Sequence, residues 1–165
     1  MTEPDEKTSE DTRLVATFLL AGGLFGIDTA LIQEVSKVGA ITPVRHAPAY
    51  VMGIRNLRGK IVTVIDLQAR LDLGAADLTG ESRILIVENA GEPVGLVVDG
   101  VSDTISINQA DIKPPPPGLH GIQAHNLLGV HRTGERIVSL LDPAIVLKAE
   151  EEHAGEMAIK ERVAS

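Results

Sequence analysis

The sequence predicts a mainly β protein built from two similar lobes, each a small five-stranded barrel. Three observations lead to this fold class. The 165 residues include 15 Ile and 16 Val but only 2% aromatic residues, and β-branched residues are enriched in strands. Apolar residues come in short segments separated by Gly, Asp, Asn and Pro, which is the spacing of strands and turns. The same pattern of segments also occurs twice along the chain.

Ten segments fit the strand pattern, and the first two enclose the pair Gly22-Gly23. Glycine adopts positive φ without steric cost, so this pair predicts a tight hairpin turn. The predicted strands are 14–20, 24–28, 35–44, 53–57, 60–67, 83–88, 93–98, 104–107, 121–129 and 136–141.

Three short helices are expected between these strands. A turn begins at Asp28 and runs through Glu34. Asp66 ends a strand and can accept backbone N–H bonds at the start of a helix over residues 67–72. Asp142 has the same role for a C-terminal helix that opens with Pro143, a residue favoured at the first helical position. Only this last helix is expected to exceed two turns.

Residues 113–118 contain four consecutive prolines, which exclude both a helix and a continuous strand ladder. The segment is predicted to be a stiff, extended connection between strands. The alternative is a polyproline ligand for an aromatic groove, which the location inside a strand-rich body disfavours.

An internal repeat organises the chain. The pair Gly26-Ile27 parallels Gly95-Leu96, 69 residues later. The stretch 53–59 followed by 61–66 recurs in outline as Gly121-Ile122, then 126–129, then 137–142, at offsets of 68, 70 and 76 residues. Two similar lobes of about five strands are implied. Closure into barrels is favoured because an open sheet of that size leaves adhesive edges.

The net charge of −8 lies mainly in the two ends of the chain. Residues 1–12 carry five acidic side chains against one lysine, and residues 149–165 carry five against two basic ones. The first segment is predicted to be a disordered acidic tail and the second an acidic helix or tail, with a body from 13 to 148 between them. No run of Lys and Arg suits nucleic acid, and no apolar run is long enough to span a membrane. A cytoplasmic protein is expected.

Templates for catalysis and metal binding fit poorly. The chain has no Cys, which excludes thiolate chemistry and cysteine metal sites. His120, His125 and His131 are spaced by five and six residues, unlike metal ligands. Asp99 and Asp103 resemble paired carboxylates, but Asp99-Gly100 is also typical of a turn between two strands. No catalytic residue, metal or cofactor is therefore predicted.

Five sequence blocks together resemble the CheW-type coupling proteins of bacterial chemotaxis. The NLRG and VDGVSD motifs carry most of the resemblance, which runs from about Arg13 to Leu147. The blocks are FGIDTALIQEV (25–35), APAYVMGIRNLRGKIVTVIDL (47–67), VGLVVDGVSDTISI (94–107), IKPPP (112–116) and RIVSLLD (136–142).

The resemblance implies a fold, partners and contact residues. The family fold has two SH3-like five-stranded barrels around a shared hydrophobic centre. Members bind the CheW-like regulatory domain of the chemotaxis histidine kinase through the end of one barrel, and the cytoplasmic tips of chemoreceptors through a groove near the junction of the lobes. The resemblance also implies that Glu34 pairs with Arg58. The positions that match the family's partner-binding residues are Ile32 and Glu34 in the first lobe, Gly53, Arg58 and Gly59 in the hairpin, and Gly95 and Val101 in the second lobe.

The resemblance thus implies a non-enzymatic adaptor, found with receptor arrays at the membrane through its partners, and the length suggests a standalone form. Two alternatives stay open. One is a paralogous coupling protein of another receptor-kinase pathway, such as surface motility or second-messenger control. The other is a small β-barrel hydrolase or ligand binder, which requires a polar pocket with convergent titratable groups.

Overall fold

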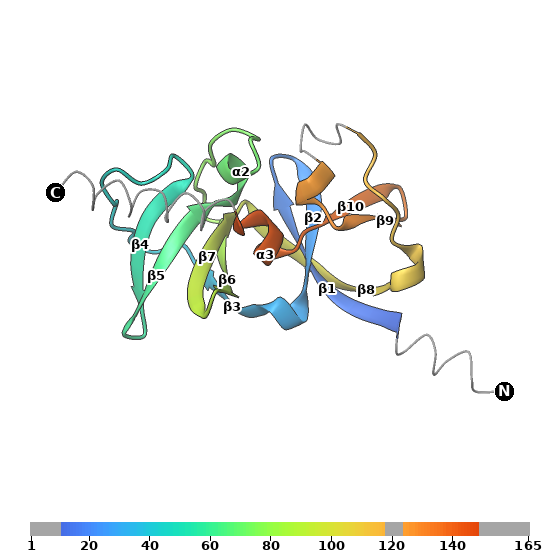
Figure 1. The fold of residues 1–165 in the computed structure, drawn as a ribbon, viewed down its shortest axis with the longest axis horizontal. Coiled ribbons are helices and arrows are strands. Elements are labelled where there is room, and N and C mark those ends of the chain that lie inside the picture. Colours follow the sequence, from blue (N-terminus) through green and yellow to red (C-terminus); the bar gives the residue numbers. More distant parts are fainter. Residues whose placement is uncertain (1–10, 118–123, 149–165) are drawn as a thin grey trace.

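The computed structural model describes residues 11–117 and 124–148, and these residues form two five-stranded sheets. One sheet has the strand order β8-β1-β2-β10-β9 and is called here the terminal barrel. The other has the order β3-β6-β7-β5-β4 and is called the central barrel; the two lie side by side in Figure 1. The mainly β fold with two five-stranded units is confirmed. The strands are β1 (Thr12–Leu20), β2 (Gly23–Asp28), β3 (Ile32–Lys37), β4 (Val51–Leu57), β5 (Lys60–Asp66), β6 (Arg83–Asn89), β7 (Glu92–Val98), β8 (Gly100–Asn108), β9 (Gly129–Thr133) and β10 (Arg136–Leu140).

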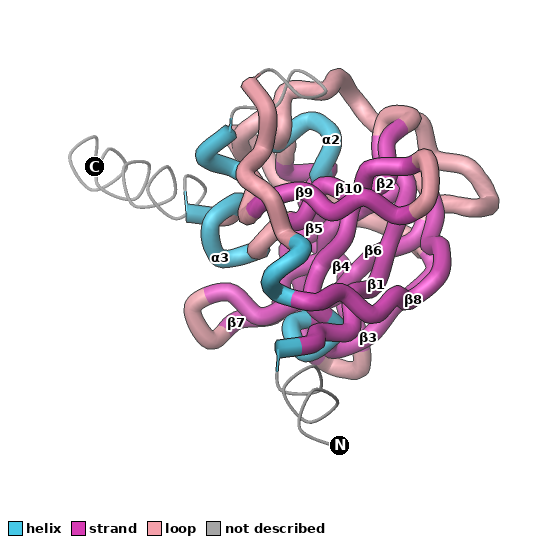
Figure 2. Tube along the Cα trace, turned by 90° about the vertical axis from the view of Figure 1, so that its right-hand side faces the viewer, coloured by secondary structure: helices cyan, strands magenta, loops and turns pink. Residues whose placement is uncertain are grey.

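Each sheet is closed by one backbone bridge between its two end strands. In the central barrel, Thr42, which follows β3, exchanges two hydrogen bonds of 2.8 Å with Ile54 of β4. In the terminal barrel, Lys113, which follows β8, exchanges bonds of 2.9 and 2.8 Å with Val130 of β9. Figure 2 looks onto the terminal barrel. These bridges reduce the exposed sheet edges that make small β proteins adhesive.

The repeat is present, but its two halves exchange strands. Each half supplies a hairpin, a single strand, a second hairpin and a helix, in that order. The first hairpins, β1–β2 and β6–β7, correspond at an offset of 69 residues, and the second, β4–β5 and β9–β10, at 76. The match of Gly53 with Gly121 that the sequence suggested is therefore replaced by a match with Gly129. Each barrel combines the first hairpin of one half with the other three strands of the other half.

Within residues 11–117 and 124–148, the buried apolar residues form three cores. One fills the terminal barrel around Val15, Ile107 and Val138, and one fills the central barrel around Val62 and Ile84. The largest lies between the barrels, where the outward faces of the β1–β2 and β6–β7 hairpins meet. Its buried members are Phe18, Leu20, Phe25, Ile27, Ile65, Leu67, Leu71, Leu85, Val87, Val94, Leu96, Val98, Leu127, Leu141, Val146 and Leu147.

In the described part of the chain, three two-residue turns carry positive φ at both central positions, the geometry of the hairpin turn that matches strand twist. They are Ala21-Gly22, Arg58-Gly59 and Ala90-Gly91, with φ from 50° to 83°. The predicted hairpin at the first site is therefore present, but it is one residue earlier than the Gly22-Gly23 pair, and Gly23 already begins β2.

The helical segments are short and start at the predicted caps. Asp28, Asp66 and Asp142 each accept a hydrogen bond from a backbone N–H in the first turn of the following helix. The helical segments are η1 (Thr29–Leu31), α2 (Leu67–Arg70), η2 (Gln109–Asp111), η4 (Ala124–Asn126) and α3 (Pro143–Val146).

Several predicted boundaries differ from the structure. The turn expected over 28–34 is helical only in η1, because Ile32 is extended and starts β3. The strand expected over 35–44 ends at Lys37, and only the bridge at Thr42 continues the pairing. Of the strand expected over 121–129, residues 124–126 form η4 and β9 starts at Gly129. The C-terminal helix, expected to exceed two turns, ends at Val146 after four residues, with Leu147 as its C-cap. The predicted tails lie outside the described residues, except for residues 11 and 12, of which Thr12 already belongs to β1.

Candidate functional site

The ion pair that the resemblance implied is present at the mouth of the central barrel. The Nη1 atom of Arg58 lies 2.9 Å from Oε2 of Glu34, and Nη2 donates to Oε1 at 3.1 Å. Both nitrogens of the planar fork therefore engage one carboxylate, the geometry that fixes orientation best. The Arg58 side chain is 78% exposed and that of Glu34 is 27% exposed, so the pair lies where a partner can reach it.

The β4–β5 hairpin presents Arg58 at its tip. Leu57 pairs with Lys60, so Arg58 and Gly59 are the two central residues of the turn. The Oδ1 atom of Asn56 accepts a hydrogen bond from the Gly59 N–H at 2.9 Å. A non-glycine residue at positive φ is uncommon, and here it directs the arginine across the barrel mouth toward β3.

Beneath the ion pair is a cavity of about 370 Å³ at the mouth of the central barrel. Glu34 lies directly opposite Ile86 on the neighbouring strand, so both face the barrel interior. Apolar side chains form the floor and charged ones the rim. The lining residues are Gln33, Glu34, Leu57, Arg58, Lys60, Val62, Ile86, Glu88, Gly91 and Pro93.

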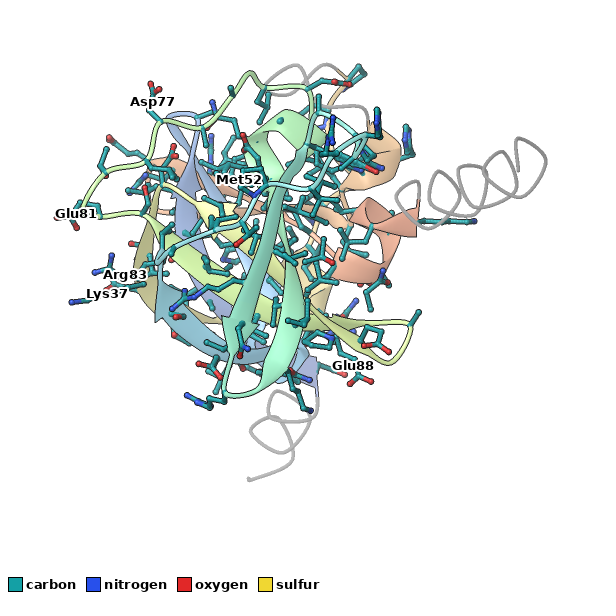
Figure 3. The ribbon with its side chains drawn as sticks, turned by 90° about the vertical axis from the view of Figure 1, so that its left-hand side faces the viewer. Lys37, Met52, Asp77, Glu81, Arg83 and Glu88 are labelled. Atoms are coloured by element: carbon teal, nitrogen blue, oxygen red, sulfur yellow. The ribbon has the colours of Figure 1, made fainter. Side chains whose placement is uncertain are left out.

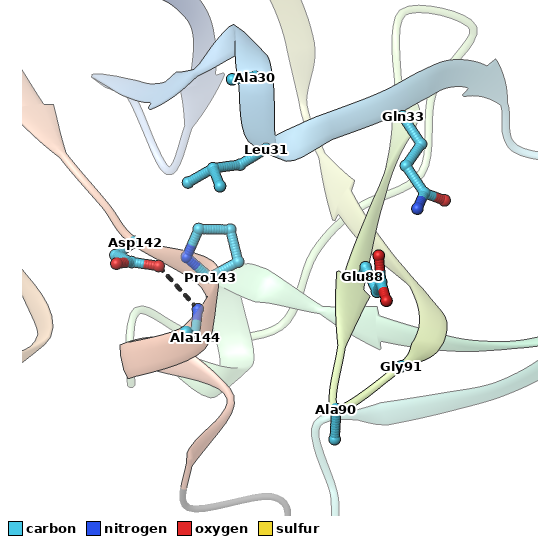
Figure 4. A pocket seen from close by; sticks show the side chains of 9 residues that line it. All are labelled: Ala30, Leu31, Gln33, Glu88, Ala90, Gly91, Asp142, Pro143 and Ala144. Carbon is cyan, nitrogen blue, oxygen red and sulfur yellow. Dashed lines mark hydrogen bonds between the residues drawn. The ribbon is translucent and has the colours of Figure 1, made fainter.

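A second cavity of about 320 Å³ lies between the barrels (Figure 4). It is bounded by η1, the β6–β7 hairpin and the start of α3, with Leu31 beside Pro143 and with Gln33 and Glu88 on the opposite wall. Gln33, Glu88 and Gly91 line both cavities. The two hollows are therefore neighbours on one face of the molecule and share a wall.

Of the seven predicted site residues, three come together, and Gly53 lies apart from them at the seam of the central barrel, against Thr42. Glu34, Arg58 and Gly59 meet at the mouth of the central barrel. Gly95 belongs to the same barrel rather than to a second lobe with Val101, because β7 lies in the central sheet. A Cβ at Gly95 would stand 2.6 Å from Cγ2 of Ile84, so this glycine serves interior packing.

Ile32 and Val101 occupy corresponding positions in the two barrels. Ile32 pairs with Val87 and Val101 pairs with Phe18, and these partners are themselves related by the 69-residue offset. Ile32 packs against the core between the barrels, whereas Val101 is 47% exposed. The terminal barrel thus presents an exposed apolar residue, Val101, at a position where the central barrel has the covered residue Ile32.

Sequence reasoning missed the residues around the ion pair. Leu57 and Val62 are recognisable only as members of alternating strands, and nothing local identifies them as the floor of a cavity. Glu88 follows Ile84 and Ile86 on the interior-facing side of β6, where it lines the mouth of the central barrel. Figure 3 shows it near the β6–β7 hairpin, far from Lys37 and Arg83 at the other end of the sheet.

Chemistry other than contact finds little support among the described residues. Within residues 11–117 and 124–148, no three His, Asp or Glu side chains gather as a metal site would require. Both described barrel interiors are filled with Val, Ile and Leu, which argues against the hydrolase alternative. In the described part of the chain, no helix has the length and hydropathy needed to cross a membrane.

Known proteins resemble the chain over most of its length. A family model described as the CheW-like domain matches residues 14–151. The chemotaxis protein CheW of Treponema pallidum is 35% identical over 143 residues, covering 84% of each chain. That of Rhizobium meliloti is 30% identical over 154 residues, covering 93% of this chain and 99% of the relative. The crystal structure of scaffolding protein TtCheW from Thermoanaerobacter tengcongensis is similar with a TM-score of 0.76 and 36% identity, covering 82% of this chain and 87% of that one.

Proposed function

The chain belongs to the CheW-like family, and from this premise we propose that it is a non-enzymatic adaptor that couples chemoreceptors to the chemotaxis histidine kinase. It holds the two partners together, which raises their effective concentration, and it makes kinase autophosphorylation depend on receptor state. The adaptor class agrees with the solved relative that is described as a scaffolding protein. Its association with the membrane is through the receptors it binds.

The mouth of the central barrel is the proposed contact for the regulatory domain of the kinase. What supports this assignment is the bidentate pair of Arg58 and Glu34 at the rim of an apolar hollow. Interfaces combine a buried apolar anchor with a polar rim, and Arg is enriched among the residues that contribute most to affinity. The pair holds the arginine in one orientation, so that a partner's apolar side chain enters over Leu57 and Val62.

The groove between the barrels is the proposed contact for the receptor tip. Its support is the wall of Leu31 and Pro143, with Leu31 42% exposed. A helix that lies in such a groove buries one apolar face there and turns its polar face outward. Because the groove shares Gln33 and Glu88 with the mouth, the two proposed partners bind next to each other.

The other predicted residues support the proposal in two ways. The exposure of Val101 supports a further proposed contact surface on the terminal barrel. Gly53, Gly59 and Gly95 act through folding: at a barrel seam, in the hairpin turn and in the barrel interior, respectively.

A reconstituted mixture of kinase, receptor in lipid nanodiscs and the purified chain tests the proposal. Kinase autophosphorylation is expected to become dependent on receptor and attractant only when the chain is present. The Arg58→Ala variant is the negative control: it lacks the proposed contact residue and is expected to couple receptor and kinase less well than the wild-type chain. Equal kinase activity with and without the chain, at concentrations well above those of the partners, would falsify the adaptor role. A response restored only by the receptor and kinase of another pathway identifies the paralogous coupler instead.

A further inference from the structure

The seam between the two end strands of the central barrel is held by side chains as well as by backbone. Of the described strands, β3 pairs only with β6, and β4 only with β5. Apart from the bridge of Thr42 to Ile54, no backbone pairing between described residues therefore joins β3 to β4. Arg55 crosses this gap. Its Nη1 atom donates to the carbonyl oxygen of Lys37 at 2.6 Å and lies 3.4 Å from Oγ of Ser36.

The local sequence makes room for this arginine. Arg55 lies opposite Val62, whose side chain belongs to the core of the central barrel, so Arg55 extends along the interior side of β4. A Cβ at Gly39 would stand 3.0 Å from Cζ and from Nη2 of Arg55. Glycine at this position therefore leaves room for the guanidinium beside the end of β3. A bond from a charged donor is stronger than a neutral one.

The contact of Arg55 and the ion pair are successive links on one seam. Arg55 and Arg58 are three residues apart on the hairpin, and their respective partners, Lys37 and Glu34, are three residues apart on β3. The hairpin strand β4 and strand β3 therefore run antiparallel along the seam that these two contacts bridge. Fixing β3 at Lys37 fixes the distance at which Glu34 faces Arg58.

Among the described residues, the terminal barrel shows no side-chain links of this kind at its seam. The counterparts of Arg55 and Arg58 at the 76-residue offset are His131 and Gly134. The Nδ1 atom of His131 is buried and has no hydrogen-bond partner. Barrel closure as such thus does not need the arginine, and its presence coincides with the barrel that carries the ion pair.

We propose that Arg55 is a positioning residue, which holds β3 in the register at which Glu34 orients Arg58 for partner binding. This rests on the proposed function of that pair. Arg55 itself turns toward the seam, so its effect on a partner is transmitted through the pair.

Three variants test this role by their affinity for the regulatory domain of the kinase. Arg55→His copies the residue of the terminal barrel and is expected to weaken binding roughly tenfold, a change of about 1.4 kcal/mol. Arg55→Lys keeps the charge but loses the planar fork of the guanidinium. Its affinity is expected to lie between that of the wild-type chain and that of Arg55→His. Arg132→His makes the same change at an exposed position of β9 and leaves affinity unchanged. Wild-type affinity in both Arg55 variants would overturn the proposal.

A double-mutant cycle separates positioning from direct contact. On the Arg58→Ala background, Arg55→His is expected to have no further effect on affinity. A second, additive loss contradicts a role through the pair.

A measurement without any partner keeps the two proposals distinguishable. The ¹⁵N NMR signal of the Arg58 Nε–H in Glu34→Gln marks the unpaired state, and Arg55→His is expected to shift the wild-type signal toward it. An unchanged signal overturns the positioning role, whatever the affinity. If the wild-type chain does not bind the regulatory domain, the kinase contact fails while this signal still decides the role of Arg55. If Arg55→His does not fold, Arg55→Lys is judged by the same signal.

Discussion

Gly53 and Gly129 hold the same position in the two barrels, and each lies against the backbone carbonyl that closes its barrel. A Cβ at Gly53 would stand 2.2 Å from the carbonyl oxygen of Thr42, and one at Gly129 would stand 2.7 Å from that of Lys113. Side chains are thus excluded at both seams by the closing bridge itself. Gly53, which the family resemblance suggested as a partner-binding position, therefore has a folding role that the repeat makes visible.

Gly53→Ala is expected to destabilise the protein by about 3 kcal/mol, because a methyl group clashes with immobile backbone and positive φ disfavours alanine. Thermal unfolding measures the loss. Gly22→Ala is the matched control, since Gly22 also has positive φ but nothing within 4 Å of the added Cβ. A destabilisation no larger than that of the control contradicts the seam role of Gly53.

Arg58→Ala is expected to change stability by no more than about 1 kcal/mol, because an exposed ion pair contributes little to folding. Affinity for the kinase regulatory domain, measured by calorimetry, is expected to fall about tenfold or more, since arginine at the rim of an apolar hollow is a strong anchor. Arg132→Ala controls for the loss of an exposed arginine. Unchanged binding would remove the mouth of the central barrel as the kinase contact.

Leu31→Asp is expected to abolish receptor binding and preserve binding of the kinase domain. Leu31 is 42% exposed, so the chain tolerates the charge, while a receptor helix in the groove does not. Co-sedimentation with receptor-bearing vesicles measures the first effect. Leu14→Asp, at a position of β1 that is 56% exposed, is expected to bind both partners. Loss of kinase and receptor binding together argues against separate sites.

Val98→Asp is expected to unfold the whole molecule, because an unpaired buried charge costs several kcal/mol. Val98 is completely buried and belongs to the core between the barrels, so both barrels lose packing at once. Circular dichroism at 25 °C detects the loss. Val101→Asp, at an exposed position, is expected to remain folded; a folded Val98→Asp protein would contradict the shared core.

The directions in which the β7 side chains face could not be predicted from the sequence. The sequence predicts a strand over 93–98 but not which of its residues face the barrel: Val97 belongs to the core of the central barrel and Val98 to the core between the barrels. In β7 five consecutive residues are buried, because both faces of the strand are covered. Alternation of apolar and polar residues, which normally reveals the inward face, is absent there.

Local features were predictable, whereas long-range pairing was not. The hairpins, the caps Asp66 and Asp142 and most strands follow from turn chemistry and periodicity. The exchange of hairpins between the halves depends on pairing of distant strands, such as Leu24 of β2 with Val138 of β10, 114 residues apart, for which no local pattern exists. The ion pair was implied by the family resemblance, whereas Arg55 and the cavity floor became recognisable only once β3 and β4 were placed at one seam.

The interleaved topology has a consequence for synthesis on the ribosome. The central barrel uses one continuous stretch, from Ile32 to Val98, and is complete as soon as that stretch has emerged. The β1–β2 hairpin leaves the ribosome first but awaits β8, which starts at Gly100. At typical elongation rates this delay is roughly 4–14 s. During that time the edge of β1 that later pairs with β8 is uncovered, and an unpaired strand edge exposes the nascent chain to aggregation.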